Sequence, residues 1–275
     1  MKIAYQGIAG SYSESCAKNN YPKCETIPCK TFDECFEMAS KDSSIRAIIP
    51  ESNKTTGNIG IEYLIFKFRL NIYSEHFYKI SHNLLGLKES KIEDITDIYS
   101  HAQALGQSSE FIKKNKFIEN VRADTAGSAK YVADLKDKSK AAIASTLSAE
   151  IYNMKILATN IQDNKENFTR FLLMGKDIIQ PENKRGSYIT SFLFKLKSKP
   201  AALYSALQGM AINGVNMIKL QSFPEKNSFS SYFFLCEVEG HIEDQKIKNS
   251  LEDLNYHCED MTVLGVFEAD KLRKK

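Results

Sequence analysis

The chain has 275 residues, which is enough for more than one hydrophobic core, so two folding units are the starting expectation. Hydrophobic residues make up 43% and charged residues 26%, and the 37 Lys and Arg against 34 Asp and Glu leave a net charge of only +3. This small charge excludes a broad basic face, so neither nucleic acid nor a membrane surface is an expected partner. No segment approaches the roughly 20 apolar residues of a membrane span, and the first residues read as a strand, so we expect a cytoplasmic protein.

The first half of the chain alternates strand and helix signals. Short apolar runs predict strands at 2–6, 45–49, 95–99 and 141–144. Helical spacing predicts helices beginning near Thr31 and over 102–114, 126–134 and 147–153. This alternation is typical of parallel sheets covered by helices, in which ligands bind at the C-terminal ends of the strands.

The last third of the chain changes character after a polar stretch with Pro and Gly at 177–187, which reads as a linker. The predicted elements that follow are a strand at 189–196, a helix at 200–213, strands at 215–222 and 229–238, a helix at 243–254 and a strand at 261–267. Their order, βαββαβ, is the ferredoxin-like motif. A module of this size suits ligand binding or pairing better than catalysis.

Polar clusters stand where predicted strands end. Residues 7–13 read Gly-Ile-Ala-Gly-Ser-Tyr-Ser and resemble an anion cradle before a helix. Residues 50–57 read Pro-Glu-Ser-Asn-Lys-Thr-Thr-Gly, directly after an apolar strand. Residues 100–107 read Ser-His-Ala-Gln-Ala-Leu-Gly-Gln, with Ser100 as the expected N-cap and the two glutamines one helical turn apart.

A fourth cluster, Asn-Phe-Thr-Arg-Phe at 167–171, sets a hydroxyl beside a guanidinium between two aromatic rings. Arginine is scarce in this Lys-rich chain, which draws attention to Arg170, because a planar guanidinium suits a carboxylate. The six cysteines form no Cys-x-x-Cys pair and the five histidines do not cluster beside them. These spacings indicate reduced thiols and predict no metal site.

The four clusters together resemble the signature motifs of the prephenate dehydratases, in that family's order and at roughly its spacing. Residues 124–129, Asp-Thr-Ala-Gly-Ser-Ala, are similar to a further family element, and 200–203 and 213–217 are similar to parts of its ACT domain. The resemblance implies an α/β fold with a two-lobed, periplasmic-binding-protein-like catalytic region at 1–178, whose second lobe is about 79–157. A linker at 179–187 and a ferredoxin-like ACT domain at 188–268 would follow. No chorismate-mutase segment precedes Met1, so we expect the monofunctional form.

The resemblance implies a hydro-lyase that converts prephenate to phenylpyruvate in phenylalanine biosynthesis, by loss of carbon dioxide and water and without a cofactor. It assigns the main role to the hydroxyl of Thr169, as hydrogen-bond donor to the leaving oxygen, and bidentate binding of a substrate carboxylate to Arg170. It also implies a wider set of site residues. The other catalytic residues are Asn53, Ser100 and Gln107, and the other substrate-binding residues are Ser11, Tyr12, Ser13, Ser52, Thr55, Thr125 and Phe171.

Two departures from the family pattern stand out. The family reads Pro-apolar-Glu-Asn where this chain has Glu51 and Ser52 before Asn53, so Ser52 occupies the family Glu position. Neighbouring side chains of a strand point to opposite faces, so either Glu51 points away from the cleft and the site has lost a carboxylate, or the loop has slipped in register. We expect the loss, with activity retained. In the ACT region, Gln221 and Phe223 stand in place of the Glu and Arg of the family's Glu-Ser-Arg-Pro motif.

Regulation is implied by the same resemblance. ACT modules pair side by side and bind phenylalanine at the seam, so we expect a homodimer or homotetramer that binds L-phenylalanine more weakly than the usual motif does. The implied effector-binding residues are Ala201, Ala202, Leu203, Asn216, Gln221 and Ser222. Two alternatives stay open: an arogenate dehydratase, and a non-enzymatic amino-acid sensor, which would need the Arg170 guanidinium but not the Thr169 hydroxyl.

Overall fold

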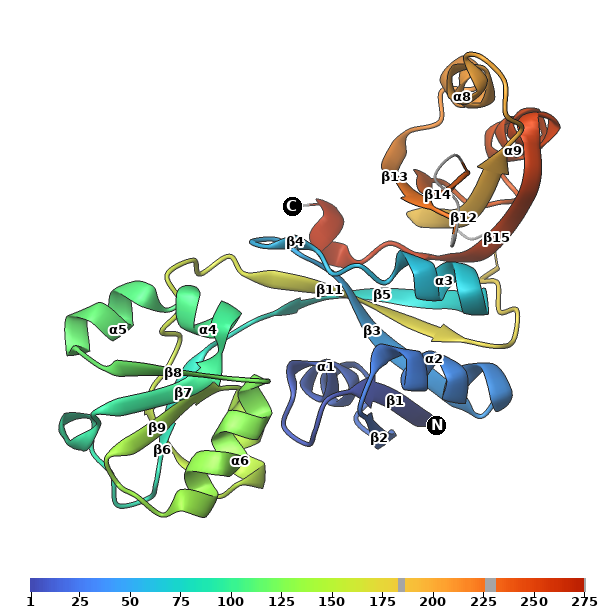
Figure 1. Cartoon of the computed structure of the whole chain (residues 1–275). Coiled ribbons are helices and arrows are strands. Elements are labelled where there is room, and N and C mark those ends of the chain that lie inside the picture. The colour runs from blue at the N-terminus through green and yellow to red at the C-terminus, as the bar shows by residue number, and fades with distance from the viewer. Residues whose placement is uncertain (183–185, 226–230, 275) are drawn as a thin grey trace. The chain divides into compact units, whose positions relative to one another are not determined.

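A computed structural model (Figure 1) describes residues 1–182, 186–225 and 231–274 of the chain. The chain divides into two compact units. The first comprises Met1–Cys35, Ile48–Ile59 and His76–Phe171, and the second Phe36–Ala47, Gly60–Glu75 and Leu172–Lys275. The division therefore does not follow chain order. Of the expected linker, residues 183–185 lie outside the described part of the chain.

The first sheet carries three of the four motif clusters at the ends of its strands. The strand order is β2-β1-β3-β11-β5, with bounds Glu25–Cys29, Lys2–Gln6, Ile45–Asn53, Phe168–Gly175 and Asn71–Lys79. β1 and β2 are parallel, and the short β4 (Gly57–Asn58) turns back to pair antiparallel with the end of β3. The strands expected at 2–6 and 45–49 are confirmed, and β3 runs on as far as Asn53. α2 (Phe32–Lys41) confirms the helix expected near Thr31.

The loop between β1 and α1 (Tyr12–Asn20) depends on Gly10. Its φ of 92° lies in the region that favours glycine, and a Cβ there would stand 2.6 Å from Ser148 Oγ. The hydroxyls of Ser145 and Ser148 both donate to the Gly10 carbonyl, at 2.6 and 2.9 Å. Ser11 then caps α1 by accepting from the backbone N–H of Glu14. The N-terminus of α1 is thereby held at the end of β1.

The second sheet lies wholly in the first unit and has the order β10-β6-β9-β7-β8. The bounds are Lys155–Ala158, Asn83–Gly86, Lys140–Ala144, Asp97–His101 and Ile118–Arg122. β7 is parallel to β8 and β9, as expected, but β6 is antiparallel to β9 and β10. β6 follows β5 directly, and only a parallel connection requires a crossover helix. Ile98, Leu105 and Ile143 lie in its buried core.

The single helix expected over 102–114 is instead two helices, α4 (Ala102–Gly106) and α5 (Ser109–Asn115). Gly106 is a weak helix former, and the carboxylate of Asp163 accepts from the backbone N–H groups of Ser109 and Glu110, both at 3.1 Å. This distant cap starts a second helix, which local spacing does not reveal. The helices expected at 126–134 and 147–153 are confirmed as α6 (Thr125–Leu135) and α7 (Thr146–Ile151); a 3₁₀ turn, η1, spans Ile92–Asp94.

The C-terminal elements form the expected ferredoxin-like arrangement. They are β12 (Tyr188–Leu196), α8 (Ala202–Ile212), β13 (Met217–Pro224), β14 (Tyr232–Glu239), α9 (Gln245–His257) and β15 (Cys258–Glu268), followed by the 3₁₀ turn η2 (Lys271–Lys274). The sheet order is β13-β14-β12-β15, so β12 and β14 are central. Phe192, Phe194 and Leu254 anchor the core beneath the two helices. The first residues of the strand expected from 229 lie outside the described residues.

In the second unit, α3 (Glu62–Phe68) packs on this C-terminal sheet. The rings of Phe66 and Phe233 lie 4.2 Å apart, and Arg69 forms an ion pair with Asp260. The side-chain amide of Gln221 on β13 donates to the Glu62 carboxylate at 2.7 Å. Among the described residues, no helix is long and apolar enough to span a membrane.

Candidate active site

A cavity of about 460 Å³ opens in the first unit, where the ends of β1, β3, β7 and β11 meet the first residues of α1 and α6. Segments from across the first 171 residues contribute to its lining. The predicted site residues that line it are Ser11, Tyr12, Ser13, Asn53, Gln107, Thr125, Thr169 and Phe171. The polar clusters at the strand ends are therefore brought to one place.

Thr169 and Asn53 are in direct contact in this cavity. The Asn53 side-chain amide donates to Thr169 Oγ1 at 2.9 Å and to Asn167 Oδ1 at 2.8 Å. Its own oxygen accepts from the backbone N–H groups of Thr55 and Thr56 at 3.0 and 3.1 Å, which fixes the orientation of the amide. Among the described residues, Thr169 Oγ1 only accepts, so the single proton of the hydroxyl is left for an acceptor in the cavity.

The hydrogen bonds continue beyond Asn167. Its side-chain amide donates to Gln107 Oε1 at 3.0 Å, and the same oxygen lies 2.8 Å from Nε2 of His82. The other ring nitrogen of His82 lies 2.7 Å from the Tyr12 hydroxyl. His82 is 2% exposed and lines the cavity. Sequence reasoning missed it, because it stands alone between β5 and β6 in no recognisable motif.

Arg170 does not line the cavity. Its side chain is 5% exposed, and its guanidinium lies 3.2 Å from the carboxylate of Glu51, which is 3% exposed. Because β11 places Thr169 and Phe171 in the cavity lining, the residue between them points to the opposite face of the sheet. In this structure the guanidinium is ion-paired with Glu51, and the expected contact of Arg170 with a substrate carboxylate stays a prediction.

Three other predicted residues also lie away from the lining. Ser100 is fully buried, and its hydroxyl donates to the Ile143 carbonyl at 2.7 Å, tying β7 to β9. It does not cap α4; His101 does, by accepting from the Gln103 N–H. The Ser52 hydroxyl donates to the Glu51 carboxylate at 2.7 Å. Thr55 faces Asn167, at 3.4 Å from its side-chain oxygen. None of these three residues lines the cavity.

The lining of the cavity combines two helix N-termini with a single carboxylate and no fixed cation. Of the described residues that line it, none is Lys or Arg, and Asp124 is the one carboxylate. The N-termini of α1 and α6 both open into it through Tyr12 and Thr125, and unpaired N–H groups there carry partial positive charge. Burial lowers the pKa of His82 and raises that of the Tyr12 phenol, so both rings are neutral at pH 7.

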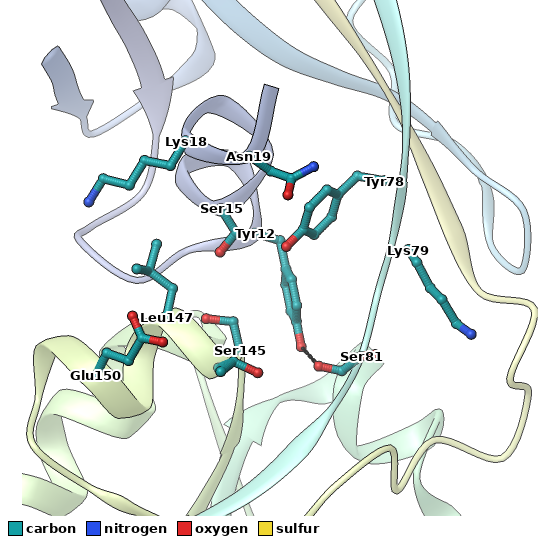
Figure 2. A pocket seen from close by; sticks show the side chains of 11 residues that line it. Tyr12, Ser15, Lys18, Asn19, Tyr78, Lys79, Ser81, Ser145, Leu147 and Glu150 are labelled. Carbon is teal, nitrogen blue, oxygen red and sulfur yellow. Dashed lines mark hydrogen bonds between the residues drawn. The ribbon is translucent and has the colours of Figure 1, made fainter. Parts of the chain in front are cut away.

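Tyr12 also lines a second, smaller cavity of about 320 Å³. Figure 2 shows its ring beside Tyr78, with the hydroxyl reaching the Ser81 carbonyl at 2.9 Å. Lys18 and Glu150 line the same cavity, which lies between α1, β5 and α7. The Tyr12 hydroxyl thus has two acceptors within reach, His82 Nδ1 and Ser81 O.

The predicted effector residues fall at different ends of the C-terminal sheet. Ala201, Ala202 and Leu203 stand at the start of α8, with Ala201 in the left-handed region at φ 53°. Asn216 precedes β13 and donates to Glu239, whereas Gln221 and Ser222 lie near the far end of that strand. Phe223 packs against Phe233, its neighbour on β14.

Comparison with known proteins decides the family. Residues 3–178, well over half of the chain, match the family described as prephenate dehydratase. The chain belongs to the prephenate dehydratase family. Arogenate dehydratase 2 of Petunia hybrida is 35% identical over 285 residues, covering 98% of this chain and 72% of that protein. The bifunctional N-acyl-homoserine lactone acylase/prephenate dehydratase of Komagataeibacter europaeus is 34% identical, covering 99% of this chain and 98% of that protein.

Among solved structures, prephenate dehydratase from Arthrobacter aurescens in complex with L-Phe matches with a TM-score of 0.87. It is 22% identical and covers 98% of this chain and 90% of that chain, so it supports the fold. The expected α/β architecture with a C-terminal ferredoxin-like sheet is confirmed. The family makes the protein a dehydratase, a carbon–oxygen lyase of phenylalanine biosynthesis.

Proposed function

We propose that this dehydratase acts on prephenate, with Thr169 as the donor to the departing ring hydroxyl. The observation that carries the proposal is the contact between Asn53 and Thr169, in which the amide donates and the hydroxyl accepts. Accepting this bond leaves the Thr169 proton for the substrate and makes the O–H group a stronger donor. A non-enzymatic sensor has no use for such a donor, so the arrangement favours an enzyme.

The reaction needs little else from the protein. The bond from the ring to its carboxylate breaks, the electron pair moves through the ring, and the hydroxyl at the opposite carbon leaves with its bonding electrons. The products are carbon dioxide, hydroxide and phenylpyruvate, and the gain of aromaticity drives the step. A donor placed where negative charge develops on the leaving oxygen stabilises the transition state more than the substrate.

The carboxylates of prephenate are proposed to bind at the helix N-termini, since Arg170 is paired with Glu51. Ser11, Tyr12 and Ser13 surround the start of α1, and Thr125 stands at the start of α6. Backbone N–H groups and hydroxyls bind carboxylates there without a cation. A strong cation beside the ring carboxylate would stabilise the substrate against decarboxylation, so its absence from the described lining suits the reaction.

Arogenate is a second candidate substrate, and Asp124 is the observation that favours it. Arogenate carries an ammonium group in place of the ketone, and the Asp124 carboxylate lines the cavity. Asp124 also caps α6 by accepting from the Gly127 N–H at 2.6 Å, a role that Asn can fill. Asp124→Asn should therefore lower kcat/KM for arogenate more than for prephenate if this carboxylate binds the ammonium.

The test of the proposed function is to give the purified full-length chain prephenate and arogenate side by side, following phenylpyruvate and phenylalanine. We expect the higher kcat/KM with prephenate. A clear preference for arogenate would replace the substrate and keep the chemistry, whereas no product from either would remove the proposal.

For regulation, we propose that residues 188–268 act as an ACT domain that binds L-phenylalanine at a seam between two copies of the chain. The α8 start and Asn216 belong to different ends of the C-terminal sheet, so within one chain these predicted effector residues lie apart. A homodimer or homotetramer would bring such ends together. The L-Phe bound to the Arthrobacter aurescens protein supports this ligand.

A further inference from the structure

His82 is the one ring in the cavity that is held on both nitrogens. Its Nε2 lies 2.8 Å from Gln107 Oε1 and its Nδ1 lies 2.7 Å from the Tyr12 hydroxyl. Its backbone N–H donates to Gln162 Oε1 at 2.9 Å. The ring is 2% exposed, and the described groups that contact it are neutral, so its orientation is fixed without an ion pair.

The partners of Gln107 determine which nitrogen of His82 carries the proton. Gln107 Oε1 accepts from the Asn167 amide at 3.0 Å, so it is the oxygen that faces His82 Nε2. An amide oxygen has no proton, and Nε2 must therefore be the donor. Burial keeps the ring neutral by lowering its pKa, so Nδ1 has a lone pair and accepts from the Tyr12 hydroxyl.

The other tautomer would reverse the direction of the bonds. With the proton on Nδ1, the Tyr12 hydroxyl would donate to Ser81 O, which is in reach at 2.9 Å. The lone pair on Nε2 would then face Gln107 Oε1, and the Gln107 amide would have to turn over. The NH₂ group of Gln107 would then face the NH₂ group of Asn167. Asn167 would have to turn over as well, which would remove the oxygen that accepts from the Asn53 amide.

We propose that His82 is a positioning residue, which as the Nε2–H tautomer orients Gln107 and, through Asn167 and Asn53, the hydroxyl of Thr169. This inference rests on the proposed function, because the role of Thr169 does. His82, which lies outside every recognised motif, would thereby set the direction of the hydrogen bonds that lead to the Thr169 hydroxyl.

A matched pair of variants separates positioning from packing. The amide of His82→Gln reaches the place of Nε2 and keeps a donor for Gln107, whereas the shorter amide of His82→Asn reaches only the place of Nδ1. We expect His82→Asn to lower kcat by about tenfold with KM within about twofold, and His82→Gln to keep kcat within about threefold of the unmodified enzyme. Equal kcat values for the two variants, or a change in KM alone, would overturn the proposal.

The tautomer can be read independently of activity. ¹⁵N NMR of the histidine-labelled full chain distinguishes a protonated from an unprotonated ring nitrogen, and His82→Gln identifies the signal. We expect the proton on Nε2; a proton on Nδ1 would contradict the inference. Failure of the proposed function looks different, because the unmodified enzyme would then turn over neither substrate whatever the tautomer.

Discussion

Two consecutive residues of β11, Thr169 and Arg170, share one sequence motif but lie on opposite faces of the strand. Thr169 lines the cavity, where it accepts a hydrogen bond from Asn53. Arg170 lies behind it, in a buried ion pair with Glu51. The same division holds on β3, where Pro50 lines the cavity and its neighbour Glu51 does not. One face of these strands holds the proposed reacting groups, and the other holds the ion pair between Arg170 and Glu51.

One sequence motif can therefore contain two residues with different roles, because the side-chain alternation of a strand places them on opposite faces. A guanidinium next to a reactive hydroxyl in sequence need not touch the same ligand. It also explains the altered loop. Glu51 stands one residue before the position of the family Glu, yet it is the carboxylate that neutralises Arg170, and Ser52 donates to it.

The largest effect, on the free energy of unfolding, is expected from the buried ion pair of Arg170 and Glu51. Glu51→Ala removes a buried carboxylate that is ion-paired with the guanidinium of Arg170, which should lower the free energy of unfolding by about 3–5 kcal/mol. An exposed-site control, Glu37→Ala, removes an i,i+4 pair at the surface and should change little. Denaturant unfolding of both variants measures this. A near-silent Glu51→Ala would mean that the pair contributes nothing to the fold and would leave Arg170 available to the substrate.

In the cavity, two variants of Asn53 test the direction of its hydrogen bond to Thr169. In Asn53→Asp the carboxylate can only accept hydrogen bonds, so the Thr169 hydroxyl would donate to this carboxylate and not to the substrate. We expect kcat of Asn53→Asp to lie about tenfold below that of Asn53→Ala, which only removes the bond. Measuring kcat at saturation separates this from repulsion of an anionic substrate. An Asp variant as fast as the Ala variant would show that the direction of this bond is unimportant.

Much of this arrangement was predictable from the sequence, and the exceptions have physical causes. Apolar runs ending in polar motifs located β1, β3 and β7, and the order of elements after residue 187 gave the ferredoxin-like sheet. The break between α4 and α5 was not visible, because its cap comes from Asp163, far along the chain. The role of His82 could not be predicted for the same reason, because its partners Tyr12 and Gln107 are distant in sequence and contact it only in the folded chain.

A smaller effect is expected in the dependence of stability on pH. The pKa of His82 is lowered by burial from its usual 6.5, so the unfolded chain binds a proton there before the folded chain does. This stability is fully present above pH 6.5 and is lost as the pH falls toward the lowered pKa of the folded state. The unmodified protein should therefore lose up to about 1.4 kcal/mol per pH unit below that point relative to His82→Gln. Parallel unfolding curves from about pH 7.5 to 5.5 would contradict this.

The smallest effect, on the response of activity to phenylalanine, is expected at the C-terminal sheet, where the Gln221 amide donates a hydrogen bond to Glu62 of α3. If phenylalanine binds at a seam between two copies, millimolar phenylalanine should raise the sedimentation coefficient and lower activity by about twofold or more. Gln221→Ala frees this position from Glu62 and should change the response to phenylalanine without changing basal kcat. A chain that sediments as a monomer, with activity indifferent to phenylalanine, would count against the proposed seam.

The most direct test of the account is the turnover of prephenate by two variants at position 169. Thr169→Ala removes the donor, whereas Thr169→Ser keeps a hydroxyl that Asn53 can still reach. We predict that Thr169→Ala lowers kcat by about 10²-fold or more while unfolding as the unmodified enzyme does, and that Thr169→Ser stays within about tenfold of it. An alanine variant that turns over within about threefold of the unmodified enzyme would contradict the assignment of Thr169 as the donor to the leaving oxygen.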